Sequence, residues 1–209
     1  MHIAILTFQG FNELDSFVAL VILNRIKKPG WRVTLCCPEG EVTSMNGVTV
    51  RAQSLLADAR SADAVIVGSG IRTRDVVANQ ELMAKLALDP ALQLIGAQCS
   101  GTLILAKLGL LGKVPACTDL TTKPWVQEAG VEVLNQPFYP AGNVATAGGC
   151  LSSPYLAAWV IARLEGWEAA AAALHYVAPV GEKEKFVAKA SSNISPYLPA
   201  SGIRVSAAR

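Results

Sequence analysis

The stretch LIGAQCSGTL, residues 94–103, decides the fold. Its first residues are small and apolar, as in a buried strand, and a segment of helical character begins at Gly101. Cys99 therefore lies where a strand turns directly into a helix, between small neighbours at Ala97 and Gly101. Small neighbours permit a sharp, strained turn that lifts a nucleophile above the sheet, as in the serine elbow of hydrolases. The stretch thus predicts a nucleophile elbow.

The position of Cys99 favours a reactive thiol. Unpaired amides and the macrodipole at a helix N-terminus favour the thiolate, so we expect a lowered pKa for Cys99. The alternative is a buried structural cysteine, because free cysteine is among the most buried residue types. The carboxyl end of a strand in an open α/β sheet is the usual place for a site, which favours the reactive interpretation.

On both sides of the elbow, short apolar runs alternate with longer segments of helical period. This alternation predicts an α/β fold, a doubly wound and mostly parallel sheet with helices on both faces. Strands are expected at 2–8, 31–37, 64–67 and 94–97, near 114, and up to 146; helices are expected at 15–26, 80–88, 101–108, 155–164 and 167–177. Residues 42–52 contain an Asn46-Gly47 turn signal and predict a hairpin on the edge of the sheet.

The chain reads as one domain over residues 1–209, with no internal repeat and no composition shift before the end. From Ala178 onward proline, serine and charged residues replace the alanine-rich helices. We therefore expect residues 178–209 to form an irregular C-terminal tail.

Composition and charge exclude several classes of protein. Apolar residues make up 52% of the chain and charged residues 16%, so a sizeable core rather than disorder is expected. A net charge of +2 without a basic patch argues against nucleic-acid binding. No apolar run reaches membrane-spanning length, and the N-terminal MHIAILTFQGF reads as a strand, not a signal peptide. A cytoplasmic location, with no nucleic-acid or membrane partner, is the expectation.

Neither the cysteines nor the glycines predict a metal or a cofactor. The five cysteines show no metal-type spacing, and the adjacent Cys36 and Cys37 do not suggest a disulfide framework. Cys117 and Cys150 are interpreted as small apolar fillers, with a resolving thiol as the alternative for Cys150. Gly68-Ser69-Gly70 lacks the third glycine of the dinucleotide fingerprint.

Asp15, which follows the first strand, is the candidate acid. The carboxyl ends of the first strand and the elbow strand are close in a doubly wound sheet, so this carboxylate can reach the thiol. The alternative is structural, because Asp15 begins a periodic apolar segment and is suited to be its N-cap.

Taken together, these motifs resemble the DJ-1/PfpI superfamily, from the first strand to about Val177. The resemblance rests on Leu14-Asp15, Gly68-Ser69-Gly70, the Ala97-x-Cys99-x-Gly101 elbow and Thr146-Ala147-Gly148-Gly149. It is nearest to the isocyanide hydratase branch, in which an aspartate lies over the nucleophilic cysteine. The resemblance implies a flavodoxin-like domain, a homodimer, and no cofactor.

The resemblance also implies roles for individual residues. Cys99 matches the nucleophile and Asp15 the acid. Ser69 and Gly70 match the oxyanion loop, with Ser69 in place of a glycine, and Ser100 follows the nucleophile. Cys150 falls where the family offers a backbone amide beside the acid.

Two departures bear on the reaction. Asp119 stands where better-known members carry histidine, and its charge would raise the pKa of a nearby thiol. The only histidines are His2 and His175, and neither follows the elbow. A cysteine protease or glutamine amidotransferase needs a histidine to move protons, so both activities are disfavoured.

The sequence therefore predicts a cysteine-dependent enzyme acting on a small molecule, with isocyanide hydration as the best single reaction. Cys99 would add to an electrophilic carbon while Asp15 shuttles the proton. The alternatives are a redox-sensing or protective protein with an oxidisable Cys99, and a stand-alone ligand-binding domain related to transcriptional regulators. Too few residues follow Val177 for a DNA-binding portion.

Overall fold

Buried parallel strands form the centre of the computed structural model, which describes residues 1–199. The main sheet contains β1 (His2–Leu6), β2 (Arg32–Cys37), β5 (Ser54–Leu55), β6 (Ala64–Val67), β7 (Leu94–Gln98), β8 (Phe138–Ala141) and β9 (Val144–Ala147). Their order is β5-β2-β1-β6-β7-β9-β8. Every pairing is parallel except that of β8 with β9. This confirms the predicted doubly wound, flavodoxin-like α/β class.

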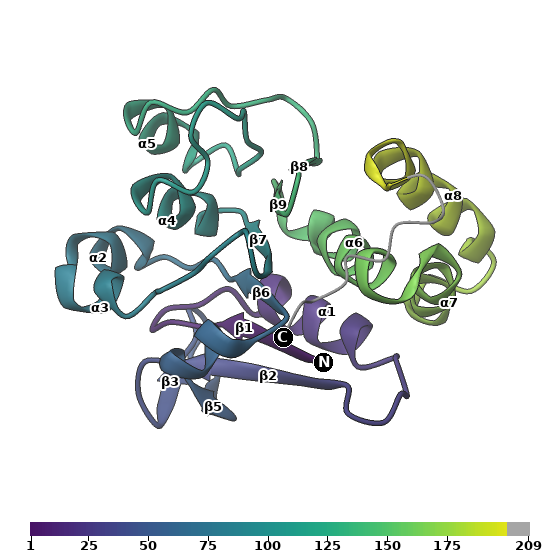
Figure 1. Ribbon diagram of the computed structural model, residues 1–209, viewed down its shortest axis with the longest axis horizontal. Coiled ribbons are helices and arrows are strands. Elements are labelled where there is room, and N and C mark those ends of the chain that lie inside the picture. The colour runs from purple at the N-terminus through teal and green to yellow at the C-terminus, as the bar shows by residue number, and fades with distance from the viewer. Residues whose placement is uncertain (200–209) are drawn as a thin grey trace.

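Helices cover both faces of the sheet (Figure 1). One face carries α1 (Glu13–Leu23), α6 (Ser153–Glu165), α7 (Trp167–Val177) and α8 (Lys183–Ile194). The other carries α2 (Thr73–Ala78), α3 (Gln80–Ala84), α4 (Gly101–Lys107) and α5 (Lys123–Glu128).

Two hydrophobic cores result, one on each face. In β1, Ile3 and Ile5 enter the core beneath α1 and α6, whereas Ala4 and Leu6 enter the core beneath α4. Alternate side chains of a strand point to opposite faces, so a strand covered on both faces must be apolar throughout. All five residues of β1 are buried, and even the polar His2 bonds to a neighbouring strand.

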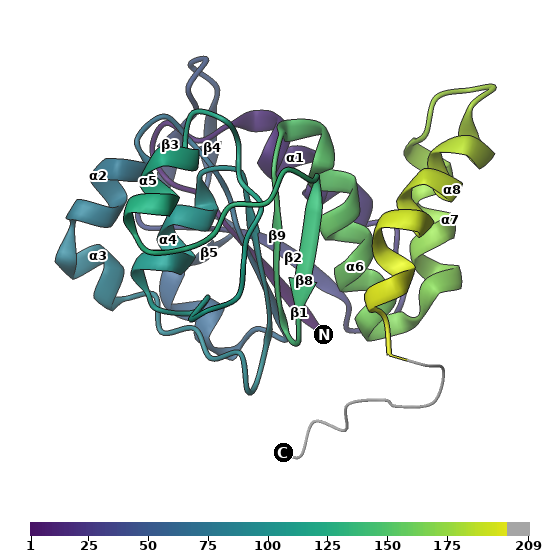
Figure 2. The same cartoon turned by 90° about the horizontal axis from the view of Figure 1, so that it is seen from above.

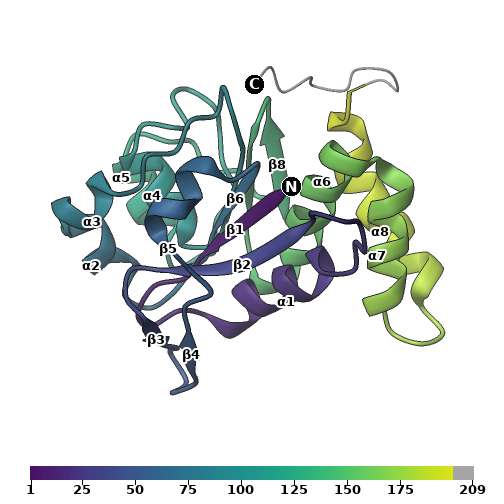
Figure 3. The same cartoon turned by 60° about the horizontal axis from the view of Figure 1, so that its bottom comes forward.

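The predicted hairpin forms, but it is a separate sheet rather than an edge of the main one. β3 (Glu41–Thr43) pairs antiparallel with β4 (Thr49–Arg51). The hairpin projects away from the main sheet in Figures 2 and 3. The strand expected near Val114 is absent, and only an isolated bridge joins Ala116 to Val133.

The irregular tail predicted for residues 178–209 is wrong for Lys183–Ile194, which form α8. This helix packs against α7 and α6 and buries Ala190 and Ile194. Figure 2 shows α7 and α8 as an outer layer beyond α6. Residues 200–209 of the predicted tail lie outside the described residues.

Over residues 1–199, none of the helices combines the length and the apolar character that crossing a membrane requires.

Candidate active site

The candidate site lies at the carboxyl edge of the sheet, where four connections converge. Asp15 is in the first turn of α1, after β1, and Ser69 and Gly70 follow β6. Cys99 follows β7, and Cys150 begins a short 3-10 helix after β9. Parallel strands deliver all these connections to one edge, and β1 and β6 flank the point where the strand order reverses.

Cys99 occupies a strained elbow between β7 and α4. Its φ of 46° is the one positive value at a non-glycine position in the described part of the chain. Such a conformation costs about 1–3 kcal/mol and persists only where the surroundings enforce it. Here the Cys99 amide donates to the Ala147 carbonyl at 2.8 Å, and the Thr118 hydroxyl donates to the Cys99 carbonyl at 2.8 Å. The predicted elbow is therefore present and fixed from both sides.

Gly101 makes the close packing behind the elbow possible. A Cβ at this position would lie 2.5 Å from the Val67 carbonyl oxygen and 2.8 Å from that of Gly68. Both atoms belong to backbone that cannot rotate aside. Only glycine therefore lets α4 start this close to the end of β6.

Asp15 is not the N-cap of α1, so that structural alternative is wrong. Asn12 is the cap, and its side chain accepts from the Leu14 amide at 3.0 Å. Asp15 lies further into the first turn, where the packing of α1 on the sheet turns its carboxyl toward the neighbouring loops. The carboxyl is fully buried; Oδ2 accepts a hydrogen bond from the Ser69 hydroxyl, and Oδ1 has no partner.

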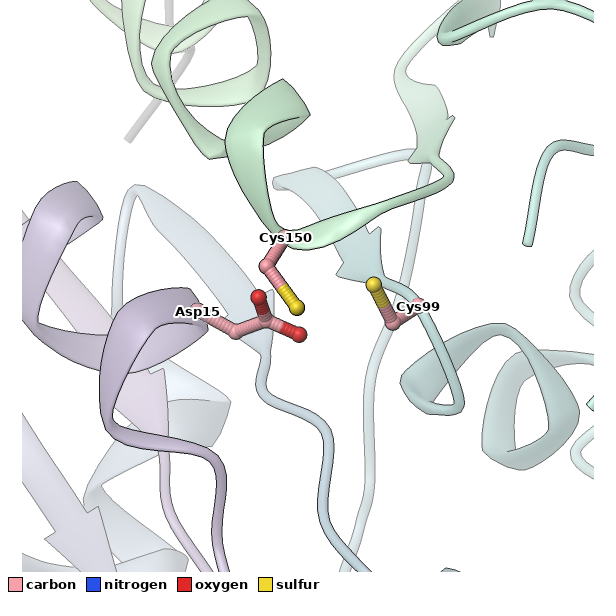
Figure 4. A group of neighbouring side chains, drawn as sticks. All are labelled: Asp15, Cys99 and Cys150. Carbon is pink, nitrogen blue, oxygen red and sulfur yellow. The ribbon is translucent and has the colours of Figure 1, made fainter. Parts of the chain in front are cut away.

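The carboxyl of Asp15 and the thiols of Cys99 and Cys150 form one cluster. One carboxylate oxygen and the two Sγ atoms all lie within 4.8 Å of one another. In Figure 4 the Cys150 side chain points toward the Asp15 carboxyl, and the Cys99 thiol faces the same space from the elbow. Asp15 is thus within reach of the thiol, as its position after the first strand predicts.

Burial dominates the electrostatics of this cluster. It raises the pKa of Asp15, and burial together with the Asp15 charge raises the pKa of Cys99 well above the ordinary thiol value. The expected lowering of the Cys99 pKa is therefore reversed. The helix N-terminus does not outweigh the removal of the sulfur from water beside a carboxylate. Because the charge of Asp15 contributes to the raised pKa of Cys99, the titrations of the two groups are coupled.

Ser69 and Gly70, for which the resemblance implies an oxyanion-binding role, both form hydrogen bonds within the site. The Gly70 amide donates to the Ser100 hydroxyl at 3.1 Å, and this hydroxyl also bonds to Thr73 at 2.7 Å. Ser69 contributes its side chain to Asp15, although its main-chain amide was the expected group. Ser100 therefore ties the loop after β6 to the elbow, and Ser69 positions the acid.

Two site residues escaped the sequence analysis. The Gln98 amide donates to the Cys99 sulfur at 3.4 Å and to the Gly149 carbonyl at 2.9 Å, which fixes its orientation. The Asn12 amide donates to the Cys150 sulfur at 3.2 Å. Gln98 had a detectable signal, since it is the one polar residue in the buried strand before the nucleophile. Asn12 had no sequence signal for a role in the site beyond its suitability as a helix N-cap.

The residues that depart from the family pattern do not contribute side chains to the cluster. Asp119 accepts hydrogen bonds from the Thr121 and Thr122 amides, both at 2.9 Å, so it organises the turn before α5. Its charge contributes to the raised pKa of Asp15. His2 bonds to the Thr34 hydroxyl at the opposite end of β1, and the exposed His175 faces Glu184 on α8. Both histidines lie in the described part of the chain, and neither belongs to the cluster.

The side chains of the cluster are of types that can bind a metal ion. Among residues 1–199 it supplies three ligand atoms, two thiols and one carboxylate oxygen. A closed structural zinc site needs four. The raised thiol pKa values further oppose binding, since a thiol must lose its proton to become a ligand.

One known protein family matches most of this chain. The model of the DJ-1/PfpI family matches residues 1–163. No curated protein sequence matches significantly.

Solved structures share the fold at low sequence identity. A DJ-1 superfamily protein from Salmonella typhimurium is 23% identical, with a TM-score of 0.70 over 95% of this chain and 99% of that one. DJ-1beta from Drosophila melanogaster is 20% identical, with a TM-score of 0.74 over 84% and 96%. An AraC family transcriptional regulator from Pseudomonas putida is 18% identical, with a TM-score of 0.71 over 85% and 99%.

Proposed function

The chain belongs to the DJ-1/PfpI family, and we propose that it is a cofactor-independent enzyme of that family that hydrates small electrophiles such as isocyanides. Cys99 is the nucleophile and Asp15 the proton donor and acceptor. One observation carries the proposal, namely a buried thiol and a buried carboxyl within 4.8 Å of each other. Such a pair suits proton transfer to a carbon during addition to a multiple bond.

In the proposed reaction, one proton passes from Cys99 to Asp15 and then to the substrate carbon. Asp15 takes the Cys99 proton as the thiolate adds to the terminal carbon of the isocyanide, and the carboxylic acid returns that proton to the same carbon. The product is a thioimidate bound to Cys99. Water then adds to this carbon, the C–S bond breaks, the thiol is restored, and an N-substituted formamide leaves. The raised pKa of Asp15 supports this role, because a carboxyl that is readily protonated can act as a general acid.

Two exposed apolar residues that adjoin cluster residues in the sequence support an uncharged, partly apolar substrate. Leu14 is 50% exposed and Leu151 is 80% exposed, and each is the sequence neighbour of a cluster residue. A hydrocarbon substituent would gain free energy by covering such side chains, at about 25 cal/mol for each Å² removed from water.

Amide hydrolysis remains disfavoured within this proposal. Protonation of a leaving amine calls for a histidine beside the nucleophile. His2 and His175 are engaged with Thr34 and Glu184, away from Cys99.

The test is turnover of a panel of alkyl and aryl isocyanides, and of methylglyoxal, by the full chain without added metal. We expect formamide production that Cys99→Ala abolishes. Cys117→Ala removes another buried thiol outside the cluster and is the matched control. Absence of turnover above the Cys99→Ala background with every substrate would refute an enzymatic role of this kind.

A redox-sensing or protective role is the second candidate, and the presence of the Cys150 thiol beside Cys99 favours it. A ligand-binding role is the third, supported by the likeness in fold to the AraC family regulator. A peroxide titration read by intact mass separates the redox role from the hydratase.

The proposal also includes a homodimer in the cytoplasm that engages neither nucleic acid nor membrane. The exposed apolar side chains of Leu14 and Leu151 support self-association, and free thiols suit a reducing compartment. Light scattering coupled to gel filtration measures the oligomeric state directly.

A further inference from the structure

We propose that Cys150 is a resolving thiol, which converts an oxidised Cys99 into a Cys99–Cys150 disulfide and so switches the site off reversibly. This modification site does not depend on the hydratase reaction. It needs only a Cys99 that peroxide oxidises and a second thiol that can reach it.

The geometry of the two thiols carries the inference. Their Sγ atoms lie within 4.8 Å of each other although the residues are 51 positions apart, since 150 − 99 = 51. Both side chains project into the same space in Figure 4. Rotation about the two Cα–Cβ bonds, with a small shift of one backbone, brings such atoms to bonding distance.

The backbone before Cys150 permits that shift. Gly149 has a φ of +83°, and a Cβ there would meet nothing within 4 Å, so no side chain packs against this position. Its carbonyl accepts hydrogen bonds from the Gln98 side chain at 2.9 Å and from the Ser152 amide at 2.8 Å. Gly148, in contrast, is held against the Thr118 carbonyl, where a Cβ would lie 2.3 Å from the oxygen. The proposed shift of Cys150 is therefore a rotation at Gly149, beyond the held Gly148, and it must keep or replace the hydrogen bond from Gln98.

Burial raises the pKa of both thiols, and the polar groups around the two sulfurs oppose part of that effect. The Asn12 amide donates to the Cys150 sulfur at 3.2 Å and stabilises negative charge on it. Gln98 does the same for Cys99 at 3.4 Å. The unpartnered Oδ1 of Asp15 is the nearby group that can accept a proton from either thiol. Cys150 is half-buried whereas Cys99 is 4% exposed, so a small oxidant such as hydrogen peroxide is required.

Hydrogen peroxide is the oxidant that forms the Cys99–Cys150 disulfide. The Cys99 thiol gives its proton to Asp15, and the thiolate attacks one peroxide oxygen. The O–O bond breaks, Cys99 becomes a sulfenic acid, and the departing hydroxide takes the proton from Asp15 and leaves as water. The Cys150 thiolate, having given its proton to Asp15, then attacks the Cys99 sulfur. The S–S bond forms and the S–O bond breaks, and the departing hydroxide collects the proton from Asp15. Overall, two thiols and one peroxide give one disulfide and two waters.

The disulfide has a distinct consequence for the site. It occupies the nucleophile and separates it from Asp15, so the proposed addition chemistry stops. It also withholds Cys99 from further oxidation to sulfinic acid, which ordinary thiols do not reverse. A dithiol reductant restores both thiols, and the switch is reversible.

The experiment treats the full-length reduced chain with an excess of hydrogen peroxide, above the roughly two equivalents that a sulfinic acid consumes. Intact mass is followed over time, and peptides are then mapped without reduction. Wild type is expected to lose about 2 Da and to yield a peptide pair joining Cys99 to Cys150, both reversed by dithiothreitol. Cys150→Ser is expected to gain about 32 Da at Cys99 as a sulfinic acid that dithiothreitol does not remove. Cys117→Ser, at a buried cysteine outside the cluster, should behave as wild type.

Two outcomes would overturn the proposal. One is a wild type that accumulates sulfinic acid at the rate of Cys150→Ser, and the other is a disulfide that joins different cysteines or two chains. The isocyanide assay is run separately on reduced protein, so failure of the proposed hydratase and failure of the switch are distinguishable. If the hydratase holds, the disulfide form loses turnover and dithiothreitol restores it.

Discussion

At the scale of single residues, the coupling of Cys99 to Asp15 dominates the chemistry. Both groups are buried, and burial raises the pKa of each, while the Asp15 charge raises that of Cys99 further. Burial alone would give two inert neutral groups. Placed within 4.8 Å of each other, they form a pair between which a proton can pass, which is what the proposed addition reaction needs.

Asp15→Asn tests this coupling through the reactivity of the thiol. Removing the charge lowers the Cys99 pKa, so we expect faster alkylation by iodoacetamide near pH 7, by roughly tenfold for each pKa unit. Turnover should fall by roughly 10²–10⁴-fold, because the asparagine cannot carry the proton. Peptide mapping after brief labelling measures the first effect.

Internal controls make that result specific. Burial alone raises the pKa of Cys117 to about 12, and burial is the main cause of a pKa of about 11 for Cys37. Their labelling should not respond to Asp15→Asn, whereas that of Cys150 should. Glu13→Gln, in the same first turn of α1, is the matched variant. Unchanged or slower labelling of Cys99 in Asp15→Asn would contradict the coupling.

Stability should depend on pH through Asp15. Its pKa is raised in the folded chain, so the fold favours the protonated carboxyl. This contribution is fully present below the ordinary value of about 4 and is lost as the pH rises through the raised folded value. Asp15→Asn cannot ionise, so its free energy of unfolding should exceed that of wild type increasingly as the pH rises toward 7.

Urea unfolding at a series of pH values measures this difference. Asp75→Asn, at an ion pair with Arg72 where both side chains are more than half exposed, is the control and should show little dependence. If the free energies of unfolding of Asp15→Asn and wild type differ by the same amount at every pH between about 4 and 7, the Asp15 carboxyl does not titrate in this range.

At the scale of elements, the site depends on how close α4 approaches the end of β6. The strained φ of Cys99, the Thr118 bond to its carbonyl and the absence of a Cβ at Gly101 belong to one arrangement. Ser100 joins this elbow to the loop after β6 through Gly70 and Thr73. The elbow and the loop after β6 are therefore held together by these hydrogen bonds.

Gly101→Ala tests the close approach. Its Cβ would lie 2.5 Å from the Val67 oxygen, so either α4 or β6 must shift. We expect a loss of about 1–3 kcal/mol in the free energy of unfolding and an altered rate of Cys99 labelling. Gly40→Ala, where a Cβ meets nothing within 4 Å, is the matched control. Wild-type stability and labelling in Gly101→Ala would show that the elbow is not sterically enforced.

At the scale of the whole molecule, the two faces of the sheet are covered to different depths. One face carries α2 to α5, whereas the other carries α1 and α6 with α7 and α8 outside them (Figures 1 and 2). The additional layer supports α6, whose N-terminal end adjoins the segment that holds Cys150.

Ile194→Ala tests whether α8 is an integral part of this layer. Ile194 is fully buried, so its truncation should lower the free energy of unfolding by about 2–5 kcal/mol. Val180→Ala, at a side chain 93% exposed, should change stability by less than about 0.5 kcal/mol. Thermal and urea unfolding measure both variants, and equal stability of the two would mean that α8 contributes little to the fold.

A feature of the fold or the site could be predicted from the sequence when the residues that cause it are neighbours along the chain. The elbow at Cys99 was predictable because the strand, the turn and the small neighbours are contiguous in residues 94–103. The helix α8 was missed because its charged residues hide the apolar positions Phe186, Ala190 and Ile194, although their spacing of four was a usable signal.

The sequence by itself determined the α/β class and the elbow, since periodicity and turn chemistry act between neighbours along the chain. The α/β class in turn predicted that Asp15 and Cys99 lie close together, because each follows a strand that ends at the same edge of the sheet. Only the tertiary structure decided that Asp15 is buried rather than a cap, that Gln98 and Asn12 contact the sulfurs, and that Cys150 joins the cluster. It also decided the direction of the Cys99 pKa. The physical reason is that burial and the approach of distant charges depend on the strand order and on helix packing, which the local pattern does not contain.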